Sequence, residues 1–160
     1  MPTHALFVLA CAAALGSAIV GGIFYAFSSF VMRALARLTP EQGIAAMNSI
    51  NVVVVTPSFM AVFAGTALAS VALALGAGIW WRPASSPPLL AGALLYALGS
   101  FGLTLACNQP MNLRLAALAP AEALAWWPGY LRRWTFWNHV RTAASLGASM
   151  LMVAALLLEG

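Results

Sequence analysis

Hydrophobic residues follow one another in four long runs along this chain, and the polar residues gather between them. The runs cover roughly residues 5–32, 52–81, 89–107 and 142–158. Each run is close to or above the about 20 residues that a helix needs to cross a bilayer. The sequence lacks the alternation with a period of two that would predict the strands of a barrel. The pattern therefore predicts four membrane-spanning helices.

The polar segments are too short for a separate soluble domain, so residues 1–160 are expected to form one transmembrane domain. Because lipid offers no partners for backbone N–H and C=O groups, each span must be helical. The fourth helix is expected to begin before its apolar run and to cover about residues 134–158. The predicted fold class is all-α, an integral membrane four-helix bundle. No positively charged segment precedes the first run, so it is expected to be retained and not cleaved as a signal peptide.

Small residues recur at the spacing of helix packing, as at Ala14, Ala18 and Gly22 in the first span. In lipid, helices approach closely only where such residues face each other. The spacing predicts a compact bundle, and the same small-residue faces allow a homo-oligomer.

Charged residues are few and unevenly placed. Seven arginines, three carboxylates and no lysine make 6% of the chain charged, against about a quarter in a soluble domain. With four spans, Arg82 lies on the face of the termini. The other six arginines, which lie on the face of the first and third loops, are Arg33, Arg37, Arg114, Arg132, Arg133 and Arg141. The positive-inside rule then predicts cytoplasmic loops and outside termini, with a bacterial inner membrane as the expected location.

These arginines lie at span ends among tryptophans, with no basic soluble surface to present them to a nucleic acid. Nucleic-acid binding is therefore excluded as a function. The expected surroundings of the protein are the lipid bilayer.

The two halves of the chain resemble each other. Arg33 and Glu41 in the first half correspond to Arg114 and Glu122 in the second, at an offset of 81 residues. Two spans in each half predict a parallel internal repeat, whose pseudo-twofold axis would run along the membrane normal.

Both cytoplasmic connections are expected to contain short helices that lie at the membrane interface. Thr39-Pro40-Glu41-Gln42 is typical of a helix start, with a capping box and a proline at the first helical position. The second connecting helix is expected to start at Pro120 and to end at Pro128. Pro57 is expected to kink the second span, and Pro110 to end the third.

The last helix carries the most unusual polar pattern. One face of it combines aromatic, amide and cationic side chains at spacings of three and four, namely Tyr130, Trp134, Trp137, Asn138, Arg141 and Ser145. An arginine inside a span costs about 2.5–3.5 kcal/mol at mid-bilayer by insertion scales. The tryptophans alone are explained by an aromatic belt, but Asn138 and Arg141 together predict a functional site.

More amides lie on the same side of the membrane. Asn108 and Asn112 flank Pro110 at the end of the third span, and Asn48 and Asn51 stand at the start of the second. Helix capping accounts for one such asparagine but does not require all of them. The sequence therefore predicts a cavity that is rich in amides, contains an arginine and opens toward the cytoplasm.

Histidines and cysteines give weaker signals. His139 is displaced from the polar face of the last helix by about 100°, so it is either a catalytic base or an interfacial histidine. His4 lies on the opposite side of the membrane, and the spacing of Cys107, Met111 and His139 fits no metal-ligand pattern. No metal site is predicted. Cys11 is expected about 25 Å from Cys107, beyond the reach of a disulfide.

The motifs near the third and fourth spans are similar to those of a known family. They are Asn108-x-Pro110-x-Asn112 and Trp134-x-x-Trp137-Asn138-His139-x-Arg141. They resemble the anthrone oxygenase-like family of small four-helix membrane proteins, and the resemblance covers nearly the whole chain. Some members are similar to enzymes that oxidise anthrones to anthraquinones. The resemblance implies site positions at Asn108, Asn112, Trp134, Asn138 and Arg141.

The resemblance implies a monooxygenase that oxidises an apolar anthrone- or quinol-like aromatic with O2, and the residues suit such a reaction without a cofactor. Arg141 and the asparagines would stabilise the charge on an enolate oxygen. Trp134 and Trp137 would stack on the rings, and Tyr130, Asn48 and Asn51 would complete the substrate site.

Two questions stay open at the level of sequence. The base that accepts the proton is Tyr130, His139 or water. The alternative function is a non-catalytic membrane protein that binds a small molecule, takes part in transport or assists a partner protein.

Overall fold

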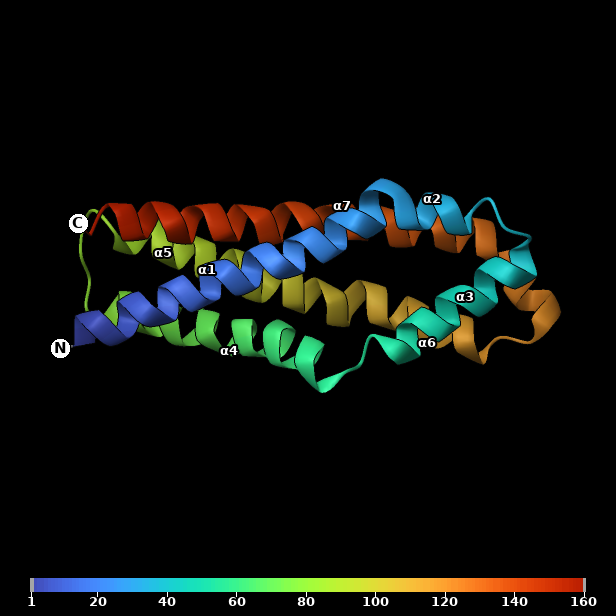
Figure 1. Ribbon diagram of the computed structural model, residues 1–160, viewed down its shortest axis with the longest axis horizontal. Helices are drawn as coiled ribbons and strands as arrows, with labels where there is room; N and C mark the ends of the chain where they lie inside the picture. Colours follow the sequence, from blue (N-terminus) through green and yellow to red (C-terminus); the bar gives the residue numbers. More distant parts are fainter. Residues whose placement is uncertain (1, 160) are drawn as a thin grey trace.

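Four helical segments run side by side in the computed structural model, which describes residues 2–159 (Figure 1). The first segment consists of α1 (Pro2–Ala26), the π-helical η1 (Phe27–Val31) and α2 (Met32–Leu35). The second consists of α3 (Pro40–Val53) and α4 (Pro57–Ile79). The third consists of α5 (Ser86–Leu94), η2 (Leu95–Gly102), η3 (Thr104–Asn108) and α6 (Gln109–Ala117), and the fourth is α7 (Pro120–Leu157).

The four segments each contain a helix long and apolar enough to cross a membrane. These helices cover His4–Leu35, Pro57–Ile79, Ser86–Ala117 and Pro120–Leu157. No strand occurs within residues 2–159. The prediction of an all-α integral membrane bundle is therefore confirmed.

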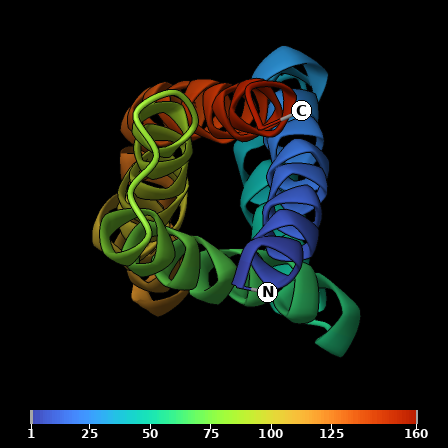
Figure 2. The ribbon, with the colours of Figure 1, turned by 90° about the vertical axis from the view of Figure 1, so that its left-hand side faces the viewer.

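Viewed along its axis, the bundle is a square (Figure 2). α1 packs against α4 and α7, and α5 packs against the same two helices from the other side. Both termini lie at one end of the bundle, while α2, α3 and α6 lie at the other (Figure 1).

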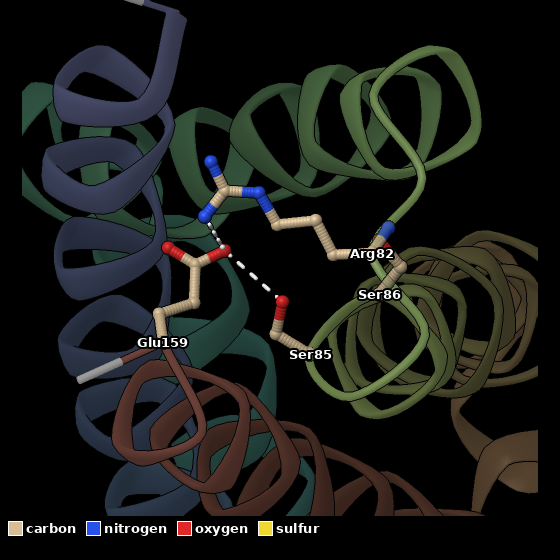
Figure 3. Close-up of polar contacts among 4 residues, drawn as sticks. All are labelled: Arg82, Ser85, Ser86 and Glu159. Atoms are coloured by element: carbon tan, nitrogen blue, oxygen red, sulfur yellow. Dashed lines mark hydrogen bonds and ion pairs between the residues drawn. The ribbon is translucent and has the colours of Figure 1, made fainter.

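Polar contacts tie the α4–α5 loop to the end of α7 (Figure 3). Nη1 of Arg82 lies 3.5 Å from Oε1 of Glu159, and the Ser85 hydroxyl donates to the same oxygen at 3.1 Å. The main-chain N–H of Arg82 donates to Oγ of Ser86 at 2.8 Å. Because the Arg82 side chain is half exposed, the ion pair itself contributes at most about 1 kcal/mol.

The bundle is longer than a bilayer is thick. With 38 residues, α7 is about 57 Å long at 1.5 Å per residue, whereas the hydrocarbon core is about 30 Å thick. Arg33, Arg114 and Arg132 are exposed at the end away from the termini. This end, formed by α2, α3, α6 and the first part of α7, therefore projects beyond the hydrocarbon, and we call it the cap.

The cap has its own hydrophobic core, the cap core. It consists of Met32, Leu35, Met47, Leu115, Ala123, Trp127, Tyr130 and Trp134. α3, which was expected to lie at the membrane interface, packs against α2, α6 and α7. The reason is that its apolar side chains find protein partners: Met47 is only 1% exposed.

Pro110 does not end the third span. A proline in a helix removes one N–H donor and crowds the carbonyl four residues earlier. Here η3, a wider π-helical turn, precedes the proline, and the N–H of Gln109 donates to the oxygen of Thr104. The helix therefore continues to Ala117.

The second connecting helix is not separate from the fourth span. α7 begins at Pro120 and runs without interruption past Pro128. Trp127 and Tyr130 on either side of this proline are buried in the cap core. Their packing holds the helix together at the position where the sequence predicted a break.

Pro57 causes a break and not a kink. Thr56 before it is extended, with φ −95° and ψ 151°, as expected for a residue that precedes proline. Thr56 also caps α4, accepting from the N–H of Phe59 at 3.2 Å. The predicted second span therefore starts at Pro57, and residues 52–56 belong to the end of α3 and to the break.

The internal repeat is visible in these boundaries. α1 with its continuation matches α5 to α6, and α3 with α4 matches α7, which starts 80 residues after α3. The halves differ in one respect. The chain is broken at Val54–Thr56 but continuous at the matching positions of α7.

Gly43 tests the packing of α3 in the cap. A Cβ atom at Gly43 would lie 2.8 Å from the Trp127 ring and 3.1 Å from the main-chain oxygen of Leu35. We expect Gly43→Ala to destabilise the protein by about 1–3 kcal/mol through overpacking. Gly129→Ala is the matched control in the same cap, because no atom lies within 4 Å of its added Cβ. Thermal unfolding in detergent measures both, and equal stability of the two variants would contradict this packing.

Candidate functional site

The predicted site lies between two cores. On one side is the cap core, and on the other is the middle core of the bundle, formed by Val20, Phe24, Phe63, Ala67, Tyr96 and Ala148. Arg141 stands 16 residues before the end of α7 at Leu157, about 24 Å along the helix. It therefore lies inside the hydrocarbon core, near the edge on the side of the cap.

Arg141 is clamped by neutral groups from three elements. Its side chain is 3% exposed. Nη1 donates to Oγ1 of Thr104 at 2.9 Å and Nη2 donates to Oδ1 of Asn138 at 2.7 Å. Cζ lies 4.1 Å from the centroid of the Phe24 ring and 5.3 Å from that of Trp134. Such cation–π contacts contribute about 2 kcal/mol or more when the cation is desolvated.

Asn138 fixes this clamp to the first span. Its Nδ2 donates to the main-chain oxygen of Phe24 at 2.7 Å and to Oγ of Ser28 at 2.8 Å. The Thr142 hydroxyl donates to the main-chain oxygen of Asn138 at 2.7 Å and lies 3.1 Å from Oγ of Ser28. Since the Thr142 hydrogen is already used, Ser28 is the donor in that last pair. Every polar atom of the Asn138 side chain is thus engaged.

A second amide cluster lies toward the cap. Oδ1 of Asn112 accepts from the Tyr130 hydroxyl at 2.8 Å and from Nε1 of Trp134 at 2.8 Å. Nδ2 of Asn108 donates to the main-chain oxygen of Trp134 at 3.2 Å. Both asparagines come from the third segment and hold the aromatic face of α7 in place.

No carboxylate balances the charge of Arg141. Within residues 2–159, the single ion pair joins Arg82 to Glu159. Glu122 and Glu159 are 19 and 18 residues from Arg141 on the same chain segment, about 27 Å away along the helix. A buried cation without a counter-charge is strongly disfavoured, so this site is prepared to receive a negative charge.

A cavity of about 110 Å³ adjoins Arg141. The lining residues are Ile23, Phe24, Phe27, Met47, Ile50, Asn51, Val54, Phe59, Phe63, Thr104, Asn112, Trp134 and Arg141. The cavity lies beside the α3–α4 break, because Ile50 precedes the break, Val54 belongs to it and Phe59 follows it. Nε of Arg141 and Nδ2 of Asn51 are buried without a partner. Two residues of the lining thus keep a free donor.

The structure brings together most of the residues predicted from the sequence. Those that form the clamp, the second amide cluster or the cavity wall are Asn51, Asn108, Asn112, Tyr130, Trp134, Asn138 and Arg141.

Three predicted residues lie elsewhere. His139 is exposed, and Trp137 is half buried with its ring against Phe136, at 5.2 Å between centroids. Asn48 is half buried and is not part of the cavity wall, although its Oδ1 lacks a partner. Trp137 lies outside the site because the stripe on α7 is narrower than the sequence pattern indicated, and His139 is exposed because it lies off the stripe, as its position in the helix indicated.

Sequence reasoning missed three residues of the clamp: Phe24, Ser28 and Thr104. Phe24 supplies a ring and a main-chain oxygen, and the two hydroxyls bind Asn138 and Arg141. Hydroxyl groups near the inner ends of apolar spans were the available signal, since polar side chains inside a membrane are seldom without partners.

Two further features bear on ligands. Among residues 2–159, no group of three His, Cys, Asp or Glu side chains is placed to hold a metal ion. A larger cavity of about 360 Å³ lies at the end of the termini, beside Trp80, Arg82 and Glu159. None of the predicted site residues lines it.

These features define an integral membrane four-helix protein with a buried polar site next to an aromatic cavity. The chain belongs to the anthrone oxygenase family, because the family model described as "Anthrone oxygenase" matches residues 55–151, more than half of its length. The matched region contains Asn108, Asn112, Trp134, Asn138 and Arg141 and leaves out Asn51 and the first span. Comparison with curated proteins and with solved structures gives no match.

Asn112 provides a test of the second amide cluster. In Asn112→Ala, the buried donors of Tyr130 and Trp134 lose their acceptor, at about 1–3 kcal/mol for each unpaired group. We expect a clear loss of thermal stability in Asn112→Ala, and a smaller loss in Asn112→Asp, which keeps an acceptor. Tyr130→Phe should then cost less in the Asn112→Ala background than in the wild type. Additive losses in this double-mutant cycle would show that the two side chains are not coupled.

Proposed function

We propose that this protein is a membrane monooxygenase that oxidises an anthrone- or quinol-like aromatic with O2, without a bound metal or flavin. The observation that carries the proposal is Arg141, which is buried without a counter-charge in the wall of an aromatic cavity. Membership of the anthrone oxygenase family supports the choice of reaction.

The proposed chemistry follows from the substrate. Loss of one proton converts an anthrone into its enolate, whose carbon adds O2 to give a peroxide anion. Protonation of this peroxide and loss of water leave the new carbonyl group, so that the enolate, one proton and O2 yield the quinone and H2O. The electrons come from the substrate itself, and the reaction therefore needs no redox cofactor from the protein.

The protein's contribution would be electrostatic. A guanidinium and amide N–H groups in a dry cavity stabilise charge on the enolate oxygen more strongly than water does. Because Thr104 and Asn138 fix two nitrogens of Arg141, the cation needs little reorganisation when the substrate binds. The rings of Phe27, Phe59 and Trp134 offer apolar surfaces against which a fused ring can lie.

The size of the cavity indicates where the substrate would enter. About 110 Å³ is less than the roughly 300–1,000 Å³ of a usual ligand pocket. One ring of the substrate would occupy it, and the rest would extend past the half-buried Ile50, Val54 and Phe59 at the α3–α4 break. Val52 and Val55 beside the break are exposed. The substrate and O2 would reach the cavity from this side.

The alternative is a membrane protein that binds the same ligand without converting it. The small size of the cavity is the observation that favours this alternative. Thermal stabilisation by quinones or anthrones, with no turnover of any of them, would support it.

Activity is tested with the purified protein, an anthrone and ¹⁸O2. We expect one labelled oxygen in the anthraquinone product, with activity that survives dialysis against a chelator. Arg141→Gln should lower kcat/KM at least 100-fold, the usual effect of losing an oxyanion donor. Asn138→Ala should also lower it, because Asn138 holds Nη2 of Arg141 in place. Arg132→Gln, an exposed arginine of the same helix, is the control and should match the wild type. Oxidation by Arg141→Gln at the wild-type rate would disprove the proposed site.

The proposed orientation, with the cap in the cytoplasm of a bacterial inner membrane, has its own test. Five exposed arginines of the cap end, Arg33, Arg37, Arg114, Arg132 and Arg133, favour it by the positive-inside rule. A reporter active only outside the cytoplasm should work when fused after residue 159 and fail when inserted at Thr39. The reverse result would mean that the protein has the opposite topology.

A further inference from the structure

The cavity wall contains hydrogen-bond donors but no side chain that can act as a base. Nine of the residues in the wall are apolar, and the four polar ones are Asn51, Thr104, Asn112 and Arg141. No Asp, Glu, His, Tyr, Cys or Lys belongs to it among the described residues.

The hydrogen-bonding groups of the wall that have no protein partner also favour a ligand that accepts hydrogen bonds. Oδ1 of Asn112 already accepts twice, and the Thr104 hydroxyl accepts from Arg141 and donates to the main-chain oxygen of Ser100. Among the residues of the wall, the buried side-chain atoms without a partner are Nδ2 of Asn51 and Nε of Arg141. The unpartnered oxygens of Asn48 and Asn108 belong to side chains outside the wall.

Titratable groups on the surrounding elements do not replace the missing base. Tyr130 on α7 lies beside Asn51 and near Arg141, and Cys107 on η3 lies near Arg141. Neither lines the cavity, and the Tyr130 hydroxyl donates to Asn112. Tyr96 on η2 donates to the main-chain oxygen of Phe63 at 3.1 Å. His139 is exposed, and α1, α3 and α4 contribute no titratable side chain to the wall.

We infer that the site recognises its ligand as an aromatic oxyanion that has lost its proton before it reaches the cavity. The part of this inference that concerns the reaction rests on the proposed function, whereas the part that concerns the ligand rests on the residues of the cavity. The proton leaves the substrate to water outside the protein, and the protein binds the phenolate or enolate that forms. An equivalent proton returns from water when the peroxide is protonated. The C–H proton of the hydroperoxide carbon then goes to water while the O–O bond breaks and releases hydroxide, so that no side chain has to act as a base.

This inference narrows the substrate class. For the proposed reaction, the ligands are flat aromatics with a weakly acidic phenol or an enolisable ketone, because these lose a proton in neutral or mildly alkaline water to give a phenolate or an enolate. Aromatics of the same shape without an ionisable group should bind poorly. The pH dependence of kcat/KM should follow the acidity of the substrate and not that of a protein side chain.

The binding part is tested with 2-naphthol, a two-ring phenol whose neutral and ionised forms have different absorption spectra. The purified protein in detergent is titrated with base, and protein-free micelles serve as the reference. We expect the ionised form to bind at least tenfold more tightly than the neutral form. The ionisation midpoint of bound 2-naphthol should therefore lie at least one pH unit below that in empty micelles.

Substitutions in the cavity wall test whether the preference for ionised 2-naphthol arises in the cavity. Arg141→Gln should return the midpoint to the micelle value, whereas Arg141→Lys, which keeps the charge, should retain part of the difference. Asn51→Asp leaves the clamp of Arg141 intact and places a carboxylate in the wall, so the preference for the anion should disappear. The exposed control Arg132→Gln should match the wild type. If Arg141→Gln does not fold, Asn51→Asp alone decides.

A midpoint in the wild type at or above the micelle value would overturn the inference, as would an unchanged preference in Asn51→Asp.

The kinetic part uses anthrones whose ring substituents change their acidity. The midpoint of the rise of kcat/KM with pH should move with the acidity of each substrate. A midpoint that stays fixed across the series would reveal a base on the protein and overturn the inference, while the proposed oxygenase function would stand. Anion-selective binding without oxidation of any anthrone would instead disprove the proposed function and support the inference about the ligand.

Discussion

The buried guanidinium of Arg141 is the group around which the structure is organised. A cation inside the hydrocarbon core is stable only if the protein replaces the water it has lost. Thr104 and Asn138 do this with hydrogen bonds, and Phe24 and Trp134 do it with their rings. These partners come from three of the four helical segments, so the position of one charge fixes how the segments pack. None of the partners is negative, and the charge remains available to a ligand.

The cavity beside Arg141 has its origin in the unequal halves of the repeat. α7 is continuous, and the helix that corresponds to it is broken between α3 and α4. Residues Val54–Thr56 interrupt the helix for about one turn, and Ile50, Val54 and Phe59 at this interruption line the cavity together with Trp134. The cap then covers this space from outside the membrane. The extended conformation that Pro57 favours at Thr56 thus contributes to the space in which we propose that the ligand binds.

The sequence predicted those parts of the site that depend on one helix. Residues three and four apart share a face, and this placed Tyr130, Asn138 and Arg141 together. Trp137 was misplaced because three residues advance a helix by about 300°, which leaves Trp137 at the edge of the stripe, about 60° from Trp134. The neighbouring helices determine which edge of this stripe is buried. For the same reason the sequence did not reveal that Phe24 and Thr104 hold the clamp from other spans.

Each of these prolines was expected to disturb its helix, but the sequence did not predict which of them would interrupt the chain. Pro57 breaks the chain, whereas Pro110 and Pro128 lie within continuous helices. The π-helical turn before Pro110 and the packing of Trp127 beside Pro128 offset the lost hydrogen bonds. The packing of Trp127 depends on contacts between segments far apart in the sequence, which no local pattern encodes.

The central claim is that an aromatic oxyanion binds to the guanidinium of Arg141 between α1, η3 and α7. An experimental structure of the protein with bound 2-naphtholate tests it most directly. We predict the ligand oxygen within hydrogen-bond distance of Arg141 or Asn51, with the rings among Phe27, Phe59 and Trp134. A ligand bound only in the larger cavity near Arg82, or an Arg141 side chain directed into lipid, would contradict the claim.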